Sequence, residues 1–271
     1  MNKMVNGEEN IFAEERKHLI VELVNKQIKT TVTQLCEQFN VSPATIRNDL
    51  RELEFAGLLK RTHGGAICNK KANYEPNSYQ KLVEQIDQKR AIAKAAARYV
   101  EQGDTIAIDT GTTTYEFVKE ITSVQNLTVV TNDVEIASYL ERNSDANVIL
   151  TGGMMRRDFH CTVGPIALNS LENLNVDRAF ISCNGINVKK GVTTPNIDIA
   201  NIKKALINLG DEVILLADFS KIGKSSFAKF ADLDKIDVLI TDGGANEEII
   251  AELGEVGVNV EVCDMSTAKG K

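Results

Sequence analysis

The chain has 271 residues, of which 43% are hydrophobic and 25% charged. This composition is that of a folded globular protein, and the length favours one small module joined to one full-sized domain. Apolar runs such as residues 213–217 are far shorter than the roughly 20 residues that cross a bilayer, which excludes an integral membrane protein. The acidic first fifteen residues do not resemble a secretory signal, so we expect a cytoplasmic protein.

Cysteine and histidine are too few and too scattered for a metal or disulfide framework. The five cysteines include no Cys-x-x-Cys pair, and the chain has three histidines. Structural zinc needs three or four converging ligands. We therefore expect no disulfides, no metal site and no cofactor.

Charge is distributed unevenly along the chain. The formal net charge is −7, yet between Arg16 and Lys71 ten Lys and Arg residues stand against five Asp and Glu residues. Residues 72–271 carry 20 basic and 29 acidic residues. A small basic module joined to a large acidic domain indicates that the module meets a polyanion and the domain does not.

The basic module begins with three predicted helices. Residues 14–27 and 31–39 carry apolar side chains at helical spacing. A third helix is predicted from Pro43 to about Ala56, because Ser42 can cap its first turn and Gly57 can end it in a left-handed conformation. In this helix the side chains expected to face the core are Ile46, Leu50 and Leu53.

The opposite face of the third helix is polar and basic. A short helix, a tight turn and a second helix with such a face are typical of a helix-turn-helix that enters the DNA major groove. Arg47 and Asn48 are the candidates for contacts with base edges, and Arg51 for a phosphate contact. Residues 58–67 predict a hairpin wing. The predicted DNA-binding residues are Ser42, Ala44, Thr45, Arg47, Asn48, Arg51, Lys60, Arg61 and His63.

These motifs resemble the amino-terminal signature of the DeoR family of bacterial transcriptional regulators. The residues that carry the resemblance are 41–50, then Leu53-Glu54-x-x-Gly57-Leu58 and Arg61-x-His63-Gly64-Gly65-Ala66. It implies a winged helix-turn-helix that binds double-stranded operator DNA. Asn48 stands where the family commonly has a second Arg, a departure that concerns base preference and leaves the DNA-binding role intact.

A polar, proline-containing segment separates this module from the rest of the chain. We expect a DNA-binding domain over 14–70, a linker over 71–77 and a sensor domain over 78–264. The sensor is predicted to start with one long helix over 78–101, and its expected inward residues are Ile86, Ile92, Ala93, Ala96 and Val100.

Short apolar segments then alternate with helical stretches. The predicted strands are 105–108, 127–130, 147–150, 179–182, 213–216, 238–240 and 258–262. This alternation predicts an α/β fold, a doubly wound and mainly parallel sheet with helices on both faces. Such sheets bind ligands at the carboxyl ends of their strands.

Five of the predicted strands end in polar or glycine-rich turns. Each turn alone would fit ordinary capping, but their convergence on one edge favours a small anionic ligand, with Lys221 as the counter-charge. The turn from Asp109 to Thr114 leads into a predicted helix at 115–121, whose first N–H groups suit a phosphate. The predicted effector-binding residues are Asp109, Gly111, Thr112, Thr113, Thr114, Thr131, Asn132, Gly152, Gly153, Asn184, Gly185 and Lys221.

The same turns resemble the carboxy-terminal sensor of the DeoR family, which is similar in fold to ribose-5-phosphate isomerase and responds to a phosphorylated sugar. The resemblance implies that the Gly-Thr-Thr turn holds the phosphate, and that Asp109, Asn132 and Lys221 hold the polyol end. Family members often have Glu where Ile199 stands, which bears on the effector that fits.

The sequence thus favours a non-enzymatic regulator, a repressor of a carbohydrate operon that acts as a dimer or tetramer on paired half-sites. Two alternatives stay open. One is a sugar-phosphate isomerase-like enzyme with an appended helix-turn-helix, in which Asp109, Asp218 and Lys221 supply the catalytic groups. The other is a protein-binding adaptor built on the winged helix.

Overall fold

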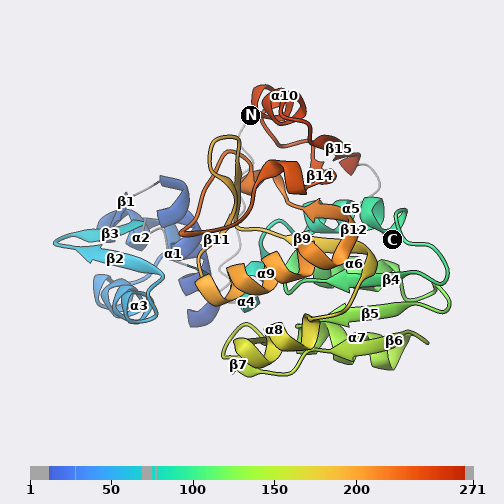
Figure 1. Ribbon diagram of the computed structural model, residues 1–271. Helices are drawn as coiled ribbons and strands as arrows, with labels where there is room; N and C mark the ends of the chain where they lie inside the picture. The colour runs from blue at the N-terminus through green and yellow to red at the C-terminus, as the bar shows by residue number, and fades with distance from the viewer. Residues whose placement is uncertain (1–11, 28, 69–74, 77, 266–271) are drawn as a thin grey trace. The chain divides into compact units, whose positions relative to one another are not determined.

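A computed structural model describes residues 12–27, 29–68, 75–76 and 78–265, and the chain divides between Pro76 and Asn77 into two compact units (Figure 1). Residues 1–11 and most of the predicted linker at 71–77 lie outside the described residues. Within the described part, no helix combines the length and hydropathy needed to cross a membrane.

The amino-terminal unit is a winged helix-turn-helix, as predicted. Its elements are α1 (Ala13–Gln27), β1 (Lys29–Thr31), α2 (Val32–Phe39), α3 (Pro43–Phe55), β2 (Leu59–Thr62) and β3 (Gly65–Cys68). The short strand β1 was not predicted. It pairs antiparallel with β3, so the wing is a three-stranded sheet in the order β1-β3-β2.

Local chemistry explains these boundaries. The Thr31 side chain and Gln34 form a capping box at the start of α2, and the Ser42 hydroxyl accepts a hydrogen bond from the Thr45 N–H at 3.1 Å at the start of α3. A Cβ on Gly65 would lie 1.9 Å from the Thr30 carbonyl oxygen, so glycine is required where β3 meets β1. Ile46, Leu50 and Leu53 are buried, as predicted.

A buried ion pair joins the first helix to the third. Arg16 on α1 donates through Nε to Asp49 Oδ2 at 2.7 Å and through Nη2 to Asp49 Oδ1 at 3.3 Å. Both side chains are at most 10% exposed. Beside them, Lys17 pairs with the exposed Glu52 at 2.9 Å. The orientation of α3 on α1 is therefore fixed by two hydrogen bonds between largely buried side chains.

The larger unit is built around a seven-stranded parallel sheet. Its helices are α4 (Ser78–Val83), α5 (Ile86–Ala97), α6 (Thr112–Glu120), α7 (Val134–Asn143), α8 (Pro165–Leu171), α9 (Ile197–Leu209) and α10 (Glu247–Glu255). The strands of the sheet are β4 (Thr105–Ile108), β5 (Thr128–Thr131), β6 (Asn147–Leu150), β9 (Val176–Ser182), β12 (Gly210–Leu216), β14 (Val238–Asp242) and β15 (Asn259–Cys263). All seven correspond to predicted strands, so the predicted α/β fold is confirmed.

The single helix predicted over 78–101 is wrong. The chain forms two helices, α4 and α5, separated at Glu84 and Gln85. Gln85 has a φ of 52°, a left-handed conformation that ends the first helix and starts the second. Neither glycine nor proline marks this break, so the residue pattern does not reveal it.

The strand order places a topological switch point at the centre of the sheet. The order is β15-β14-β12-β9-β4-β5-β6, with every neighbouring pair parallel. From β4 the chain builds outward through β5 and β6, then returns to place β9 on the other side of β4. Doubly wound sheets bind ligands outside the carboxyl ends of the two strands at this point, here β4 and β9.

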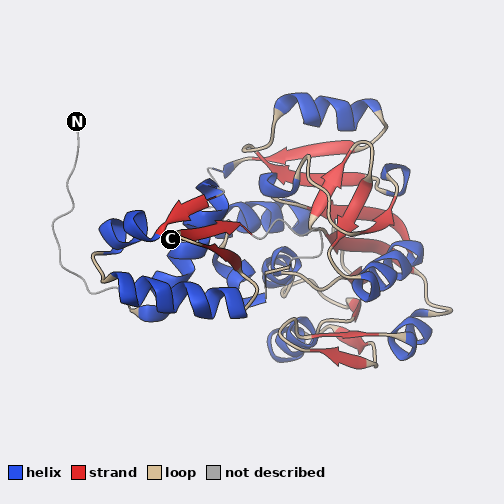
Figure 2. Ribbon diagram, turned by 90° about the vertical axis from the view of Figure 1, so that its left-hand side faces the viewer, coloured by secondary structure: helices blue, strands red, loops and turns tan. Residues whose placement is uncertain are grey.

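Helices cover both faces of the sheet (Figure 2). One core packs α5, α6 and α7 on the sheet through Ile92, Phe117 and Ile136. The opposite core includes Ala167, Ile202 and Leu253 from α8, α9 and α10. Smaller sheets that were not predicted are the hairpin β7 (Met154–Arg156) and β8 (Cys161–Val163), and the trio β10 (Gly185–Asn187), β11 (Gly191–Thr194) and β13 (Ala228–Ala231).

We expect Arg16→Met to lower the free energy of unfolding of the amino-terminal unit by about 3 kcal/mol, because it leaves the buried Asp49 carboxylate unpaired. The double variant Arg16→Met/Asp49→Leu should recover most of that loss, since no charge then stays buried. Lys17→Met, which breaks the exposed pair, should cost at most about 1 kcal/mol. Hydrogen exchange of the α1 and α3 amides measures all three, and additive losses in the double variant would contradict the assignment.

Candidate functional site

The outer face of α3 is exposed and pre-arranged. Arg47, Asn48 and Arg51 are exposed, whereas Thr45 is half-buried. Arg51 Nη1 donates to Asn48 Oδ1 at 3.1 Å, which orients the Asn48 amide. The hydroxyls of Ser42 and Thr45 lie 2.9 Å apart, so the helix cap occupies both groups. The face predicted to read DNA therefore presents a guanidinium and an oriented amide, the groups that pair with guanine and adenine.

A groove of about 330 Å³ lies between α3 and the wing. The residues that line it include the basic residues Arg47 and Arg61, together with His63 and the buried Leu50. Glu54 on α3 accepts a hydrogen bond from the Arg61 N–H at 2.8 Å and lies 3.8 Å from its guanidinium. The helix and the wing are thus tied together on either side of a groove with basic walls. Lys60, like His63, is exposed on the wing.

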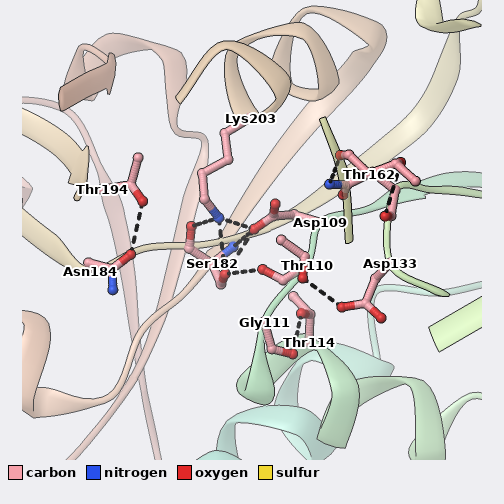
Figure 3. A network of polar contacts seen from close by, with 11 residues as sticks. Asp109, Thr110, Gly111, Thr114, Asp133, Thr162, Ser182, Asn184, Thr194 and Lys203 are labelled. Atoms are coloured by element: carbon pink, nitrogen blue, oxygen red, sulfur yellow. Dashed lines mark hydrogen bonds and ion pairs between the residues drawn. The ribbon is translucent and has the colours of Figure 1, made fainter. Parts of the chain in front are cut away.

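At the topological switch point, a buried ion pair joins three elements (Figure 3). The ammonium of Lys203, on α9, contacts Asp109 Oδ2 at the end of β4. Ser182, at the end of β9, donates to the same oxygen from its N–H at 3.1 Å and lies 2.8 Å from it through Oγ. Lys203 also donates to the Ser182 carbonyl at 2.9 Å. The other oxygen, Asp109 Oδ1, is buried and has no partner within the described residues.

The amino terminus of α6 begins next to this ion pair. Its N-cap is Gly111, so no described side chain caps the first turn, and the first backbone bond inside the helix runs from Tyr115 N–H to the Gly111 carbonyl. A Cβ on Gly111 would lie 2.5 Å from Ser182 Oγ, so only glycine fits here. The uncapped N–H groups at the positive end of the helix dipole form a site suited to a phosphate or carboxylate.

The three threonines of this turn differ in their roles. Thr112 is half-buried, Thr113 is buried, and Thr114 is buried with its hydroxyl donating to the Gly111 carbonyl at 2.9 Å. Thr114 therefore shapes the turn from inside it. The half-buried part of the predicted phosphate site consists of Gly111 and Thr112 together with Thr110.

The end of β5 supplies a second buried acceptor. Asn132 donates from its amide nitrogen to the Thr162 carbonyl at 3.1 Å, and its Oδ1 has no partner in the part of the chain that the structure describes. Thr131 is occupied, because its hydroxyl accepts from the Asp133 N–H at 3.1 Å. Thr151 lies 2.9 Å from Thr162 through their hydroxyls. The side-chain oxygen Asn132 Oδ1 is thus the acceptor that these framework bonds do not use.

The other predicted effector residues have different surroundings. Asn184 is half-buried and accepts from the Thr194 hydroxyl at 3.0 Å, whereas Gly185 is buried inside the small sheet beside Lys224. Gly152 and Gly153 are exposed at the start of the β7–β8 hairpin. Lys221 is half-buried, with Nζ 3.9 Å from Asp218 Oδ2. The strand ends thus converge at Asp109, Gly111 and Asn132, and Gly185 contributes packing.

Two residues of this cluster, Lys203 and Ser182, were not predicted. Lys203 is 94 residues from Asp109 along the chain. The available signal was a lysine on an apolar face, since Lys203 lies four residues from both Ile199 and Ile207. Ile199, where the family often has Glu, is buried in the core. It brings no carboxylate to the strand ends.

Asp133 links the turn at residues 109–114 to α7. Its Oδ1 caps α7 by accepting from the N–H groups of Glu135 and Ile136, and its Oδ2 accepts from the Thr110 hydroxyl at 2.6 Å. Burial raises the pKa of Asp133 from 3.8 to about 6, against the opposing effect of these hydrogen bonds.

Asp133 should therefore make stability depend on pH. Between about pH 4 and 6 the folded state holds this proton and the unfolded state releases it, so the stabilisation is full below pH 4 and is lost as the pH rises through 6. Asp133→Asn keeps a capping side chain and removes the titration. Relative to the unaltered protein, its free energy of unfolding should improve by roughly 2–3 kcal/mol between pH 4 and 7. Urea unfolding across this range measures the difference, and a constant difference would contradict the assignment.

Comparison with known proteins identifies the family. Two family models match, a DeoR-like helix-turn-helix domain over residues 16–72 and a DeoR C terminal sensor domain over residues 84–243. The HTH-type transcriptional regulator GlpR of Haloferax volcanii is 40% identical over 247 residues, which cover 91% of this chain and 96% of that protein. The putative aga operon transcriptional repressor of Escherichia coli O157:H7 is 31% identical over 262 residues, which cover 96% and 97%.

Among solved structures, ribose 5-phosphate isomerase A of Methanocaldococcus jannaschii is similar at 18% identity with a TM-score of 0.39, over 51% of this chain and 55% of that one. The family models span both units, and the sequence relatives align along nearly their whole length. The chain belongs to the DeoR family of transcriptional regulators.

Proposed function

We propose that this protein is a sequence-specific repressor of a carbohydrate-metabolism operon, and that a phosphorylated sugar bound at the carboxyl ends of β4 and β5 controls it. The observation that carries the proposal is the juxtaposition at the switch point. There, an uncapped helix amino terminus at Gly111 stands beside the buried carboxylate of Asp109, which has one oxygen without a partner in the described chain.

The two halves of this site call for different chemical groups. The amino terminus of α6 offers N–H donors and a positive dipole end, and Lys221 lies half-buried at the same edge of the sheet, so this side suits an anion such as a phosphoryl group. Asp109 Oδ1 and Asn132 Oδ1 are acceptors, and a buried acceptor without a donor is costly. Sugar hydroxyls would supply those donors. A polyol that carries a phosphate meets both requirements.

We infer a binding role rather than a catalytic role for Asp109. Lys203 and Ser182 hold Oδ2 from two sides, which fixes the carboxylate in the frame of the sheet. The named relatives are transcriptional regulators, which also points away from an enzyme. The putative aga operon repressor resembles this chain along almost its entire length, which supports repression of an operon by this protein.

The DNA-binding half of the proposal rests on the α3 face and the wing. Arg47→Ala should weaken binding to operator DNA by about 1–3 kcal/mol and relax the sequence preference at one base pair, because a bidentate base contact is lost. Arg51→Ala should weaken binding uniformly across sequences and reduce the salt dependence, as a phosphate contact would. Titration against a library of operator variants separates the two effects. Unchanged affinity for DNA in both variants would contradict the proposal that this face of α3 contacts DNA.

The effector half is tested by thermal unfolding with a panel of pentose and hexose phosphates. A matching ligand at a hundred times its Kd should add about 2.7 kcal/mol to the stability of the sensor unit. Gly111→Ala should abolish this gain, because its Cβ collides with Ser182. Gly243→Ala is the matched control, since a Cβ there meets nothing within 4 Å. If no sugar phosphate in the panel stabilises the sensor unit, the proposal of a sugar-phosphate effector is wrong. Turnover of a panel member would favour the isomerase alternative.

A further inference from the structure

The short helix α4 follows directly after the boundary between the two units, and its first residue is held by a hairpin turn. The N–H of Ser78 donates to the Asp158 carbonyl at 3.2 Å, in the turn between β7 and β8. The ammonium of Lys81 lies 5.5 Å from the centre of the Phe159 ring in the same turn. Ser78 and Lys81 of α4 therefore rest on the β7–β8 turn.

Lys89, on α5, holds the other end of α4. Its side chain is buried, with the residue only 4% exposed. The ammonium donates to the Glu84 carbonyl at 2.6 Å and also to the Lys81 carbonyl. Carbonyls at a helix end have no partner inside the helix, and a lysine can satisfy them. A buried ammonium whose hydrogen-bond partners are neutral carbonyls is expensive, so its position calls for an explanation.

The surroundings of Lys89 connect it to the proposed effector site. Burial lowers its pKa to about 8, while the charge of Asp218 raises it and that of Lys221 lowers it further. Asp218 and Lys221 follow β12, at the strand ends. In addition, α4 packs against α6, the helix whose amino terminus is the proposed phosphate site. Lys89 thus feels the charges of two residues that follow β12, and α4 packs on the helix whose amino terminus is the proposed phosphate site.

The β7–β8 turn is itself bonded to the strand ends. The N–H of Val134 donates to the His160 carbonyl at 2.9 Å, and Asn132 and Thr162 exchange hydrogen bonds at 2.9 and 3.1 Å. The hairpin whose turn supports Ser78 is thus hydrogen-bonded to Asn132 and Val134, the residues that follow β5.

We propose that Lys89 is a positioning residue that holds α4 against the strand ends, and that release of α4 is how an anion bound there changes the affinity for DNA. This inference rests on the proposed function. A phosphoryl group offers Lys89 a charged acceptor in place of two neutral carbonyls, and charge-assisted bonds are the stronger ones. The ligand then binds the released state better, which is the difference in affinity that any such shift requires.

The proposal is tested first without a ligand, in the full chain. Lys89→Met removes the donors and keeps the length and the burial, so it should mimic the liganded state and change the affinity for DNA about fivefold or more. Lys204→Met, an exposed lysine on α9, should leave it within twofold. Phe159→Ala removes the ring that contacts the Lys81 ammonium and so loosens α4 on the β7–β8 turn, which should shift the affinity in the same direction. If Lys89→Met does not fold, the Phe159→Ala variant tests whether α4 controls the affinity for DNA.

Hydrogen exchange of residues 78–85 reports on α4 itself. Exchange should rise in Lys89→Met and, for a sugar phosphate that stabilises the unaltered sensor, on addition of that ligand. Unchanged DNA affinity in both Lys89→Met and Phe159→Ala would overturn the role of α4. Failure of the whole sugar-phosphate panel would instead overturn the effector, and the ligand-free DNA measurements would still decide whether α4 controls binding.

Discussion

The buried contact between Asp109 and Lys203 is the interaction on which the sensor unit depends. It joins the end of β4 to α9, and through Ser182 to the end of β9, at the switch point where the direction of strand addition reverses. Two charges at this depth are tolerated because each satisfies the other. Loss of either would leave an isolated charge between the two strands that form the proposed site.

Around this pair, most polar groups serve the framework. The hydroxyls of Thr114 and Thr131 bond within their own turns, the Thr162 hydroxyl bonds to the Thr151 carbonyl, and Asp133 caps α7. The framework leaves few polar groups without a described partner. They include the N–H groups in the first turn of α6, the carboxylate oxygen Asp109 Oδ1 and the carboxamide oxygen Asn132 Oδ1. The proposed ligand site therefore consists of the groups that the framework does not use.

Local patterns in the sequence predicted much of this molecule. The apolar segments marked all seven strands of the large sheet, and Ser42 and Gly57 bounded the recognition helix. Long-range features escaped: Lys203 meets Asp109 across 94 residues, and β1 is a strand because β3 passes it. The break at Gln85 escaped because an ordinary residue adopts a left-handed conformation there. The order of the strands, which creates the switch point, has no local signature at all.

The link between Glu54 and the wing has a consequence for recognition. Because Glu54 holds the backbone of Arg61, the pitch of the wing relative to the recognition helix is set before any duplex arrives. Ordering of a loop on contact costs free energy that is subtracted from affinity, and a pre-set wing avoids that cost. The same bond places a carboxylate among the cations of the module. This carboxylate would repel the phosphates of a duplex that is bound out of register. The bond between Glu54 and Arg61 would thus both fix the wing and disfavour misaligned DNA.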